Sequence, residues 1–586
     1  MYARSIDTDK GPGPLLRSEQ TTSSQRGPAG GAKGTAYYFE TFTSDLGDWS
    51  SVTLAGNVNW KWTDVGPGPT ASFYPVPPLA TTAGWVIIDD DHDGMAGNVV
   101  HAHLISPVID LSGAPAYLQL EFDQYFQEFQ FDSTIVGIST DGGLEWQEME
   151  INNGVGRDGR PNPEHIAINI TDWIGGDPSN VQIRFRYRSE WDYGWQIDNV
   201  AIREMPEHEL AILQGGISHS HDGTEFGFIP LSELPGELQV VAELFNAGSQ
   251  TMHDVEILVE LKDEDGQVVA EETFNVPEIT SWDTVLVDML MTVDDLVNGV
   301  YTAYFTASSM ELDADPENNV AQRTFLINED FYGLDGIGIY AADELVTTAI
   351  GTNSFEDAED QLHLMNYFPV INGLTVYGIQ FRIDPSSEAG AYVYAGIHDS
   401  VAVMNDQLDA SYAETDFYDI TEDDIANGVV NLFFQQPVML NAGAYYADLV
   451  LHSTFGNSHI RVVDDITVPQ PSLAAVIHIQ DDQTYTNGNA YSIRLILDPE
   501  AVGMLETANT DGPQLFPNPG NGSVQLFLPN AGPHQVEVID ASGSIVLHDR
   551  ITNGSLLDLS HCAPGVYLVR LTNEQGSSTI KYVKEL

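Results

Sequence analysis

Three carboxylates in one short segment have the spacing of a calcium-binding loop. Asp89, Asp91 and Asp93 alternate in the run DDDHDG at positions 89–94. Alternate carboxylates before a glycine can wrap oxygen ligands around Ca²⁺. An EF-hand would need a glutamate six residues after the glycine, where this sequence has Val100. We therefore expect a structural calcium site or a solvated acidic turn here, and no catalysis.

Two pairs of histidines have a spacing that would allow each pair to share a metal. His101 and His103 lie two positions apart in a predicted strand, so both face the same side. His219 and His221 lie two apart in a predicted loop, next to Asp222. Neither pair has a third ligand that the sequence identifies, so packed or surface histidines are the alternative in both cases.

A further segment has the pattern S-x-D-x-G-x-x-W. It runs from Ser139 through Asp141 to Trp146. The pattern predicts a hairpin in which the aspartate accepts hydrogen bonds from turn amides while the tryptophan packs beneath it. A propeller would need several copies at blade spacing, and the sequence has one, so we expect a structural hairpin.

Aromatic residues crowd one segment near position 193. Stacked aromatic rings suit sugar binding, and this makes Trp191 and Tyr193 candidate ligand-binding residues. Trp195 alternates with Ile197 and is predicted to lie in the core.

Familiar catalytic motifs do not occur in the sequence. There is no HExxH, no GxSxG, and no P-loop or GxGxxG that opens a helix. Cys562 is the single cysteine, which excludes an intramolecular disulfide and a cysteine-based zinc site. Paired carboxylates are too common in so acidic a chain to identify a glycosidase pair. We expect no catalytic domain in this chain.

Composition predicts a multidomain all-β protein. The chain has 586 residues, of which 42% are hydrophobic and 10% aromatic, so it can form several cores. Turn formers are abundant, with 52 Gly and 30 Pro, and no long helical periodicity stands out. We expect tandem β-sandwiches.

The charge balance is strongly acidic. The 21 Lys and Arg residues face 87 Asp and Glu residues, for a net charge of −66. Such a field argues against nucleic acid and anionic membranes as partners. It suits divalent cations and saline surroundings, where salt screens the self-repulsion. No apolar run reaches the ~18 residues of a membrane span, and residues 1–36 lack the apolar core of a signal peptide and are expected to be flexible.

The predicted elements group into four folded units. In the first, at 37–204, alternating strands are expected at 99–105, 117–125, 134–139, 181–187 and 194–202. With the motifs Phe39-Glu40, IIDDDHDG, LISPVIDLSG and GWQIDNV, this unit resembles the cleaved-adhesin or choice-of-anchor (MAM-like) jelly rolls. The resemblance implies bound calcium at the acidic run, and Glu40 and Asp198 as further calcium ligands.

The next two units are also predicted to be sandwiches. Residues 207–328 contain long strands around an Asn-Ala-Gly turn and a Glu-Asp-Gly hairpin, and end in ELDADPENNVAQRTFLI. They resemble CARDB-like, immunoglobulin-type domains. Residues 330–499 are expected to form another jelly-roll sandwich, and residues 500–514 a linker.

The last unit, at 515–586, opens with LFPNPGNGSVQLFLP. Val524, Leu526 and Leu528 alternate with other residues in the pattern of a half-buried strand, and four more strands follow. A small antiparallel β-sandwich is expected. The unit closely resembles the C-terminal sorting domain of the type IX secretion system of Bacteroidota. The residues that carry the match are Phe516, Pro517, Asn518, Pro519, Gly565, Tyr567, Lys581 and Lys584.

These resemblances imply a secreted or surface-attached binding protein, similar to adhesins and without a catalytic domain. Its partners would be the type IX translocon and a glycan or protein ligand that the sequence does not name. Two alternatives remain open. The chain could be the non-catalytic part of a secreted hydrolase, or a carbohydrate-binding surface protein.

Overall fold

The computed structural model confirms an all-β protein. The chain divides into two compact units, Met1–Pro499 and Glu500–Leu586. The structure describes residues 4–5, 34–68, 76–94, 98–127, 132–152, 161–175, 177–190, 192–354, 360–405, 407–408, 411–479, 484–486, 488–500, 514–516, 520, 522–528, 534–540, 545–573 and 576–584. The flexible segment predicted at 1–36 and the linker predicted at 500–514 lie largely outside these residues. None of the described helices is long and apolar enough to span a membrane.

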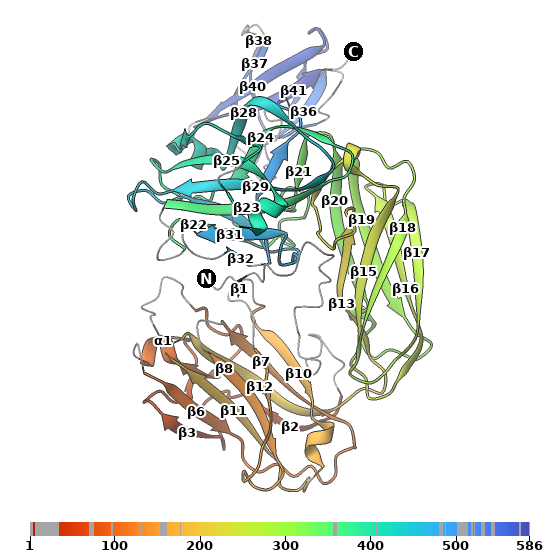
Figure 1. The fold of residues 1–586 in the computed structure, drawn as a ribbon, viewed down its shortest axis with the longest axis vertical. Helices are drawn as coiled ribbons and strands as arrows, with labels where there is room; N and C mark the ends of the chain where they lie inside the picture. The colour runs from red at the N-terminus through yellow and green to blue at the C-terminus, as the bar shows by residue number, and fades with distance from the viewer. Residues whose placement is uncertain are drawn as a thin grey trace. The chain divides into compact units, whose positions relative to one another are not determined.

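The first sandwich consists of two facing antiparallel sheets (Figure 1). One has the order β10-β7-β12-β5-β4, with β2 paired to β12, and the other has the order β3-β6-β11-β8-β9. Phe185 and Trp195 meet edge to face between the two sheets, with ring centroids 5.5 Å apart. The elements are β2 (Ala36–Glu40), β3 (Ser50–Ala55), β4 (Lys61–Thr63), β5 (Trp85–Asp89), α1 (Asp90–Asp93), β6 (Val100–Ile105), β7 (Leu118–Phe126), β8 (Ser133–Ser139), β9 (Gln147–Glu150), β10 (Glu164–Asn169), η2 (Thr171–Ile174), β11 (Gln182–Ser189) and β12 (Gly194–Glu204).

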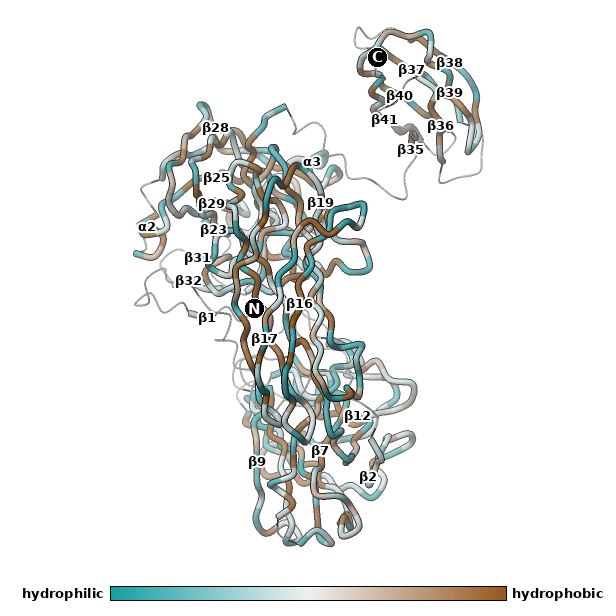
Figure 2. The backbone as a smooth tube through the Cα atoms, turned by 90° about the vertical axis from the view of Figure 1, so that its right-hand side faces the viewer, coloured by the Kyte–Doolittle hydropathy of each residue, from teal (hydrophilic) through white to brown (hydrophobic). Residues whose placement is uncertain are grey.

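The second sandwich packs the sheet β13-β15-β18 against the strands β17-β16-β19-β20. Buried and exposed residues alternate along its long strands, and brown and teal segments alternate accordingly in Figure 2. The elements are β13 (Leu210–Ser218), β14 (Phe228–Pro230), η3 (Leu231–Glu233), β15 (Glu237–Asn246), β16 (Met252–Asp263), β17 (Val268–Ile279), β18 (Thr284–Thr292), β19 (Gly299–Ser308), η4 (Pro316–Asn318) and β20 (Val320–Asn328).

The third sandwich shares a sheet with the second. The order β17-β16-β19-β20-β14-β21-β34-β24-β28 runs without a break through both, and β14 pairs in parallel with β20 and antiparallel with β21. The facing sheet has the order β1-β32-β31-β23-β29-β25-β26, with β27 on β25, and a small sheet has the order β22-β30-β33. The domain boundary near 329 stays a prediction.

The elements of the third sandwich are β1 (Arg4–Ser5), β21 (Phe331–Gly333), β22 (Thr347–Gly351), β23 (Asp360–Val370), β24 (Leu374–Arg382), β25 (Tyr392–Asp399), α2 (Ser400–Met404), β26 (Ala413–Glu414), β27 (Tyr418–Asp419), α3 (Glu422–Asn427), β28 (Val429–Leu440), β29 (Gly443–His452), β30 (Arg461–Asp465), β31 (Ala475–Ile479), β32 (Thr484–Thr486), β33 (Ala490–Tyr491) and β34 (Ile493–Ile496).

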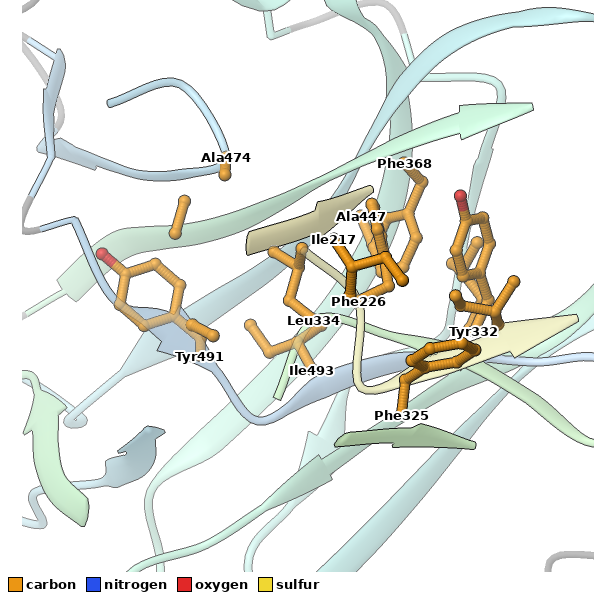
Figure 3. Packing of buried hydrophobic residues seen from close by; sticks show 14 of the residues in the cluster. Ile217, Phe226, Phe325, Tyr332, Leu334, Phe368, Ala447, Ala474, Tyr491 and Ile493 are labelled. Carbon is orange, nitrogen blue, oxygen red and sulfur yellow. The ribbon is translucent and has the colours of Figure 1, made fainter. Parts of the chain in front are cut away.

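Buried aromatic rings connect the cores of these two sandwiches (Figure 3). Phe226 lies against Tyr332, with ring centroids 4.7 Å apart, and Tyr332 meets Phe368 edge to face at 5.0 Å. All three residues belong to one continuous hydrophobic cluster with strands of both sandwiches. The shared sheet and the shared core therefore make these two sandwiches one structural body.

The C-terminal unit is a small antiparallel sandwich, as predicted. Its sheets have the orders β35-β36-β39 and β38-β37-β40-β41, and they enclose a separate hydrophobic cluster that includes Val524, Val538 and Val569. Its strands are β35 (Gln514–Phe516), β36 (Ser523–Phe527), β37 (His534–Asp540), β38 (Ile545–Ile551), β39 (Leu556–Asp558), β40 (Gly565–Asn573) and β41 (Gly576–Lys584).

Candidate functional site

The acidic run at 89–94 forms a helical turn instead of an open loop. Residues 90–93 are α1, and the Asp89 side chain caps this helix by accepting a hydrogen bond from the amide of His92. The cation that the run contacts is the Lys61 ammonium, 2.5 Å from Asp93 Oδ2 and 3.9 Å from Asp89 Oδ2. Burial raises the pKa of the Asp89 carboxyl, which is 1% exposed. The capping geometry explains the helical turn, because Asp at an N-cap and acidic residues in the first turn favour a helix.

Glu40 and Asp198 are far apart in the sequence but lie on neighbouring strands in the fold. Glu40 ends β2, next to Val200 of β12, and Asp198 lies on β12 opposite Asp123 of β7. Asp198 accepts a hydrogen bond from Thr81 Oγ1 at 2.6 Å, while its buried Oδ1 atom accepts none from the side chains and backbone that the structure describes. Burial raises the pKa of Asp198 to about 6, and the charges of Asp123 and Glu40 add to the rise.

Of the two aromatic candidates, Tyr193 alone lies among the described residues. Trp191 lies outside them. Tyr193 is 6% exposed, and its carbonyl accepts a hydrogen bond from the amide of Asp91. Their role in ligand binding stays a prediction. Trp195 is fully buried, which confirms its place in the core.

The S-x-D-x-G-x-x-W segment is the predicted structural hairpin between β8 and β9. Asp141 Oδ1 accepts hydrogen bonds from the amides of Leu144 and Glu145 at 2.9 and 3.0 Å. Trp146 Nε1 donates to the carbonyl of Gly143 at 3.0 Å. The aspartate therefore satisfies turn amides, and the segment needs no catalytic explanation.

The side chains of His219 and His221 have different surroundings and do not share a partner. His219 is 1% exposed, and its Nε2 atom lies 2.7 Å from Tyr332 Oη. Burial lowers the pKa of His219 to about 3. His221 instead contacts the carbonyl of Glu237. Among the described residues, no group of three or more His, Cys, Asp or Glu side chains is arranged to hold a metal ion.

The histidines at 101 and 103 lie side by side on the outer face of the first sandwich, with ring centroids 5.1 Å apart. The adjacent strand β11 pairs Arg188 with His101 and Arg186 with His103. Burial and the arginine charges lower the pKa of both imidazoles, that of His103 to about 4. A metal cation is disfavoured next to these guanidinium groups. The motif RFRYR at 184–188 indicates a positively charged face in the sequence, because alternate residues of a strand project to the same side.

Sequence reasoning also missed a buried His–Asp cluster on the outer face of the sheet β31-β23-β29-β25. Asp448 Oδ2 lies 2.7 Å from His363 Nδ1 and 3.2 Å from His398 Nε2. Burial raises the pKa of the Asp448 carboxyl, but the two imidazoles lower it by more, so that it comes to about 2. No sequence signal marks this cluster, since its members come from three separate strands.

The sorting-motif residues occupy the C-terminal sandwich. Phe516 lies in β35, and Pro517, Asn518 and Pro519 lie outside the described residues. Gly565 begins β40 and pairs with Lys584. Tyr567 is 5% exposed and donates a hydrogen bond to the carbonyl of Ala563 at 2.6 Å. Lys581 lies in β41, and its side chain is not among those described.

Lys584 is a structural anchor in this sandwich. It is 8% exposed, and its ammonium donates to the carbonyls of Ser560, at 2.8 Å, and Cys562. Its positive charge is therefore directed into the domain, where it holds the loop between β39 and β40.

We predict that Lys584→Met loosens this loop, because the two carbonyls lose a charged donor at a cost of roughly 1–3 kcal/mol. Hydrogen exchange followed by mass spectrometry should be faster in peptides that cover 556–573. Arg570→Met is the control, since Arg570 is half-exposed and pairs with Glu537 at 3.5 Å. Equal exchange in the Lys584 variant and the parent would contradict the anchoring role.

The comparisons with known proteins agree with the sorting-domain prediction. A family model described as "Secretion system C-terminal sorting domain" matches residues 514–585. No curated protein is significantly similar to the chain in sequence.

Several solved structures share parts of the fold. The K3 cleaved adhesin domain of Lys-gingipain from Porphyromonas gingivalis is 15% identical, with 29% of this chain and all of that chain covered, and a TM-score of 0.20. A CARDB domain from Pyrococcus furiosus is 13% identical, with 21% and 90% covered, and a TM-score of 0.16. A β-glucuronidase from Parabacteroides merdae is 13% identical, with 48% and 36% covered, and a TM-score of 0.22. Values this low carry no argument about ligand or activity.

The C-terminal match is different in kind, because the family model covers nearly every residue of a separately folded sandwich. The strand order, the core and the motif all lie within 514–585. Residues 514–585 are therefore a type IX secretion C-terminal sorting domain, and the chain that carries them is exported to the cell surface or the extracellular space.

Proposed function

We propose that this protein is an exported, non-catalytic binding protein of the adhesin-like kind. The sorting domain directs its export, and the first sandwich contacts the ligand. The second and third sandwiches, which share a sheet and a core, have a structural role. The observation that carries the proposal is the sorting domain, since it places the whole chain where it can meet external ligands.

The buried titratable groups support a structural role. His219 is tied to Tyr332, and Asp448 lies between His363 and His398. These groups take part in short hydrogen bonds within the protein and stabilise particular strands. A catalytic acid or base would instead need to reach a substrate atom.

The proposal is tested with the purified full-length chain on arrays of immobilised glycans and extracellular proteins. We expect saturable binding without turnover. The same preparation is incubated with the bound ligand and the products are analysed by mass spectrometry. Cleavage of the ligand, at a rate that Asp448→Asn abolishes, would overturn the non-catalytic assignment.

We also propose that calcium braces the first sandwich at Glu40 and Asp198, and not at the acidic run. The carboxylates of Asp89 and Asp93 face the Lys61 ammonium, and this positive charge disfavours a divalent cation at the acidic run. Asp198 has a buried carboxylate oxygen and lies near the negative charges of Asp123 and Glu40. Carboxylate oxygens are the ligands that calcium prefers, and backbone carbonyls and water would complete its shell.

The stability of the calcium-free protein is expected to depend on pH through Asp198. The pKa of Asp198 is about 6 in the folded state, above the ordinary value of 3.8, so the folded state binds the proton more tightly. Stability must therefore fall as the pH rises through this interval. Asp198→Asn should stabilise the calcium-free protein at pH 7.5 by roughly 1 kcal/mol after allowance for solvent screening, or about 2–4 °C.

The same variant tests calcium binding. Millimolar CaCl₂ should raise the melting temperature of the parent, since a ligand that binds only the folded state stabilises it. Asp198→Asn should lose this response, and Asp172→Asn, an exposed aspartate of η2, should keep it. A parent protein whose melting temperature ignores calcium would contradict the proposal.

A further inference from the structure

The outer face of the first sandwich carries a row of arginines in a chain that has few cations. Arg184, Arg186 and Arg188 alternate with buried residues along β11, so all three project to the same side. Alternate residues of a strand are about 6.6 Å apart, and the row therefore spans about 13 Å. His101 and His103 of the adjacent strand β6 lie on the same face. We call these five residues the arginine row.

The charges on this face are only partly compensated. Glu148 of β9 contacts Arg184 at 2.5 Å and Arg186 at 3.4 Å. Arg188 is exposed, and none of the described residues forms an ion pair with it. Burial lowers the pKa of both histidines, and the arginine charges add to the lowering. Glu150 of β9 also lies on this face, because it pairs with Ile135, which pairs with Arg186. Three arginines therefore face two glutamates, in a chain of net charge −66.

Aromatic and apolar side chains flank the row. The Trp146 ring lies against the Arg184 guanidinium, 4.0 Å from its centroid. On the other side lies β3. Its residue Val52 pairs with His103 of β6 and is 38% exposed, and Leu54 is 55% exposed. The face thus combines a line of cations with apolar and aromatic borders on a strand-built surface.

We propose that the arginine row binds a linear acidic polysaccharide, with guanidinium groups paired to carboxylate or sulfate groups along the polymer. This assignment rests on the proposed binding role and names its ligand class. A row of equally spaced charges matches a polymer with repeated anions better than a single small anion. Guanidinium groups pair with such oxyanions by two parallel hydrogen bonds. At physiological salt, the acidic surface beyond about 8 Å is screened and repels the polymer little.

The test uses the full-length chain and three polysaccharides: alginate, which carries carboxylates, dextran sulfate, and neutral dextran. Binding is measured by affinity electrophoresis and calorimetry in 50 mM NaCl. We expect binding to one or both polyanions, none to dextran, and loss of binding in 500 mM NaCl. Alginate alone would identify carboxylates as the recognised groups, and dextran sulfate alone would identify sulfates.

Matched variants separate this site from general electrostatics. Arg186→Gln with Arg188→Gln should weaken binding at least tenfold. Arg186→Lys with Arg188→Lys, which keeps both positive charges, should bind within about threefold of the parent. Arg550→Gln with Arg570→Gln removes the same charge from the sorting domain and should leave binding unchanged. Arg188→Gln alone serves if the double variant does not fold.

Two results would overturn the assignment. One is a parent protein that binds neither polyanion, and the other is an Arg186/Arg188 double variant that binds as tightly as the parent. Both are distinct from failure of the proposed function. A protein that bound a neutral glycan or a protein on the arrays would remain an exported binding protein with a different ligand.

Discussion

Deletion of residues 500–586 is expected to abolish export of the protein. The sorting domain is a separate compact unit, and the main hydrophobic clusters of residues 1–499 include none of its residues. The remainder should fold but lose the address that the secretion machinery recognises. In a host with type IX secretion, the surface and medium fractions together should fall to a background of about a tenth or less, as measured by immunoblotting of fractions.

A reciprocal fusion controls for folding defects. Residues 500–586 joined to a periplasmic carrier protein should send that carrier to the surface or medium. The same fusion with Tyr582→Ala should fail, because Tyr582 is fully buried in the sorting domain and its hydroxyl accepts a hydrogen bond from the amide of Gly522. Surface delivery of the truncated chain would refute the sorting role.

Disruption of the ion pair between Arg494 and Asp335 is expected to cause the largest loss of stability from a single substitution. Arg494 is 1% exposed and Asp335 fully buried. Two hydrogen bonds join them, from Nε to Oδ2 at 2.8 Å and from Nη2 to Oδ1 at 2.5 Å. The guanidinium also lies 3.8 Å from the ring centroid of Phe228. The pair therefore connects β34 to the segment that follows β21, and the contact with Phe228 adds β14.

Asp335→Asn and Arg494→Met should each cost about 3–5 kcal/mol, because each leaves a buried charge without its partner. A fall of roughly 10 °C in the main melting transition is expected. The double variant should be more stable than the sum of the single changes predicts, since it buries no unpaired charge. Thermal unfolding followed by circular dichroism, with all four proteins, measures this coupling.

A partly exposed pair in the same unit provides the control. Glu260 and Lys262 lie 2.9 Å apart with side chains that are 27% and 28% exposed. Glu260→Gln should cost less than about 1 kcal/mol, as is usual for surface ion pairs. If Asp335→Asn lowered the unfolding free energy no more than Glu260→Gln does, the buried pair would not stabilise the shared sheet as we predict.

The sequence by itself determined the local structure and the sorting domain. Strand residues alternate between core and solvent, so the period of Val524, Leu526 and Leu528 sufficed to predict a half-buried strand, and all three are buried. The same rule places the three arginines at 184, 186 and 188 on one face. The sorting domain was predictable because its motif and its strands lie within one short continuous segment.

Only the tertiary structure decided which distant residues meet. Glu40 and Asp198 are brought together by the pairing of β2 with β12, and Arg494 reaches Asp335 across 159 positions. The single sheet that joins the second and third sandwiches depends on β14 pairing with both β20 and β21. Such contacts follow from long-range strand pairing, which side-chain alternation does not specify. Lys61 likewise meets the acidic run only in the folded chain, where its ammonium contacts Asp89 and Asp93.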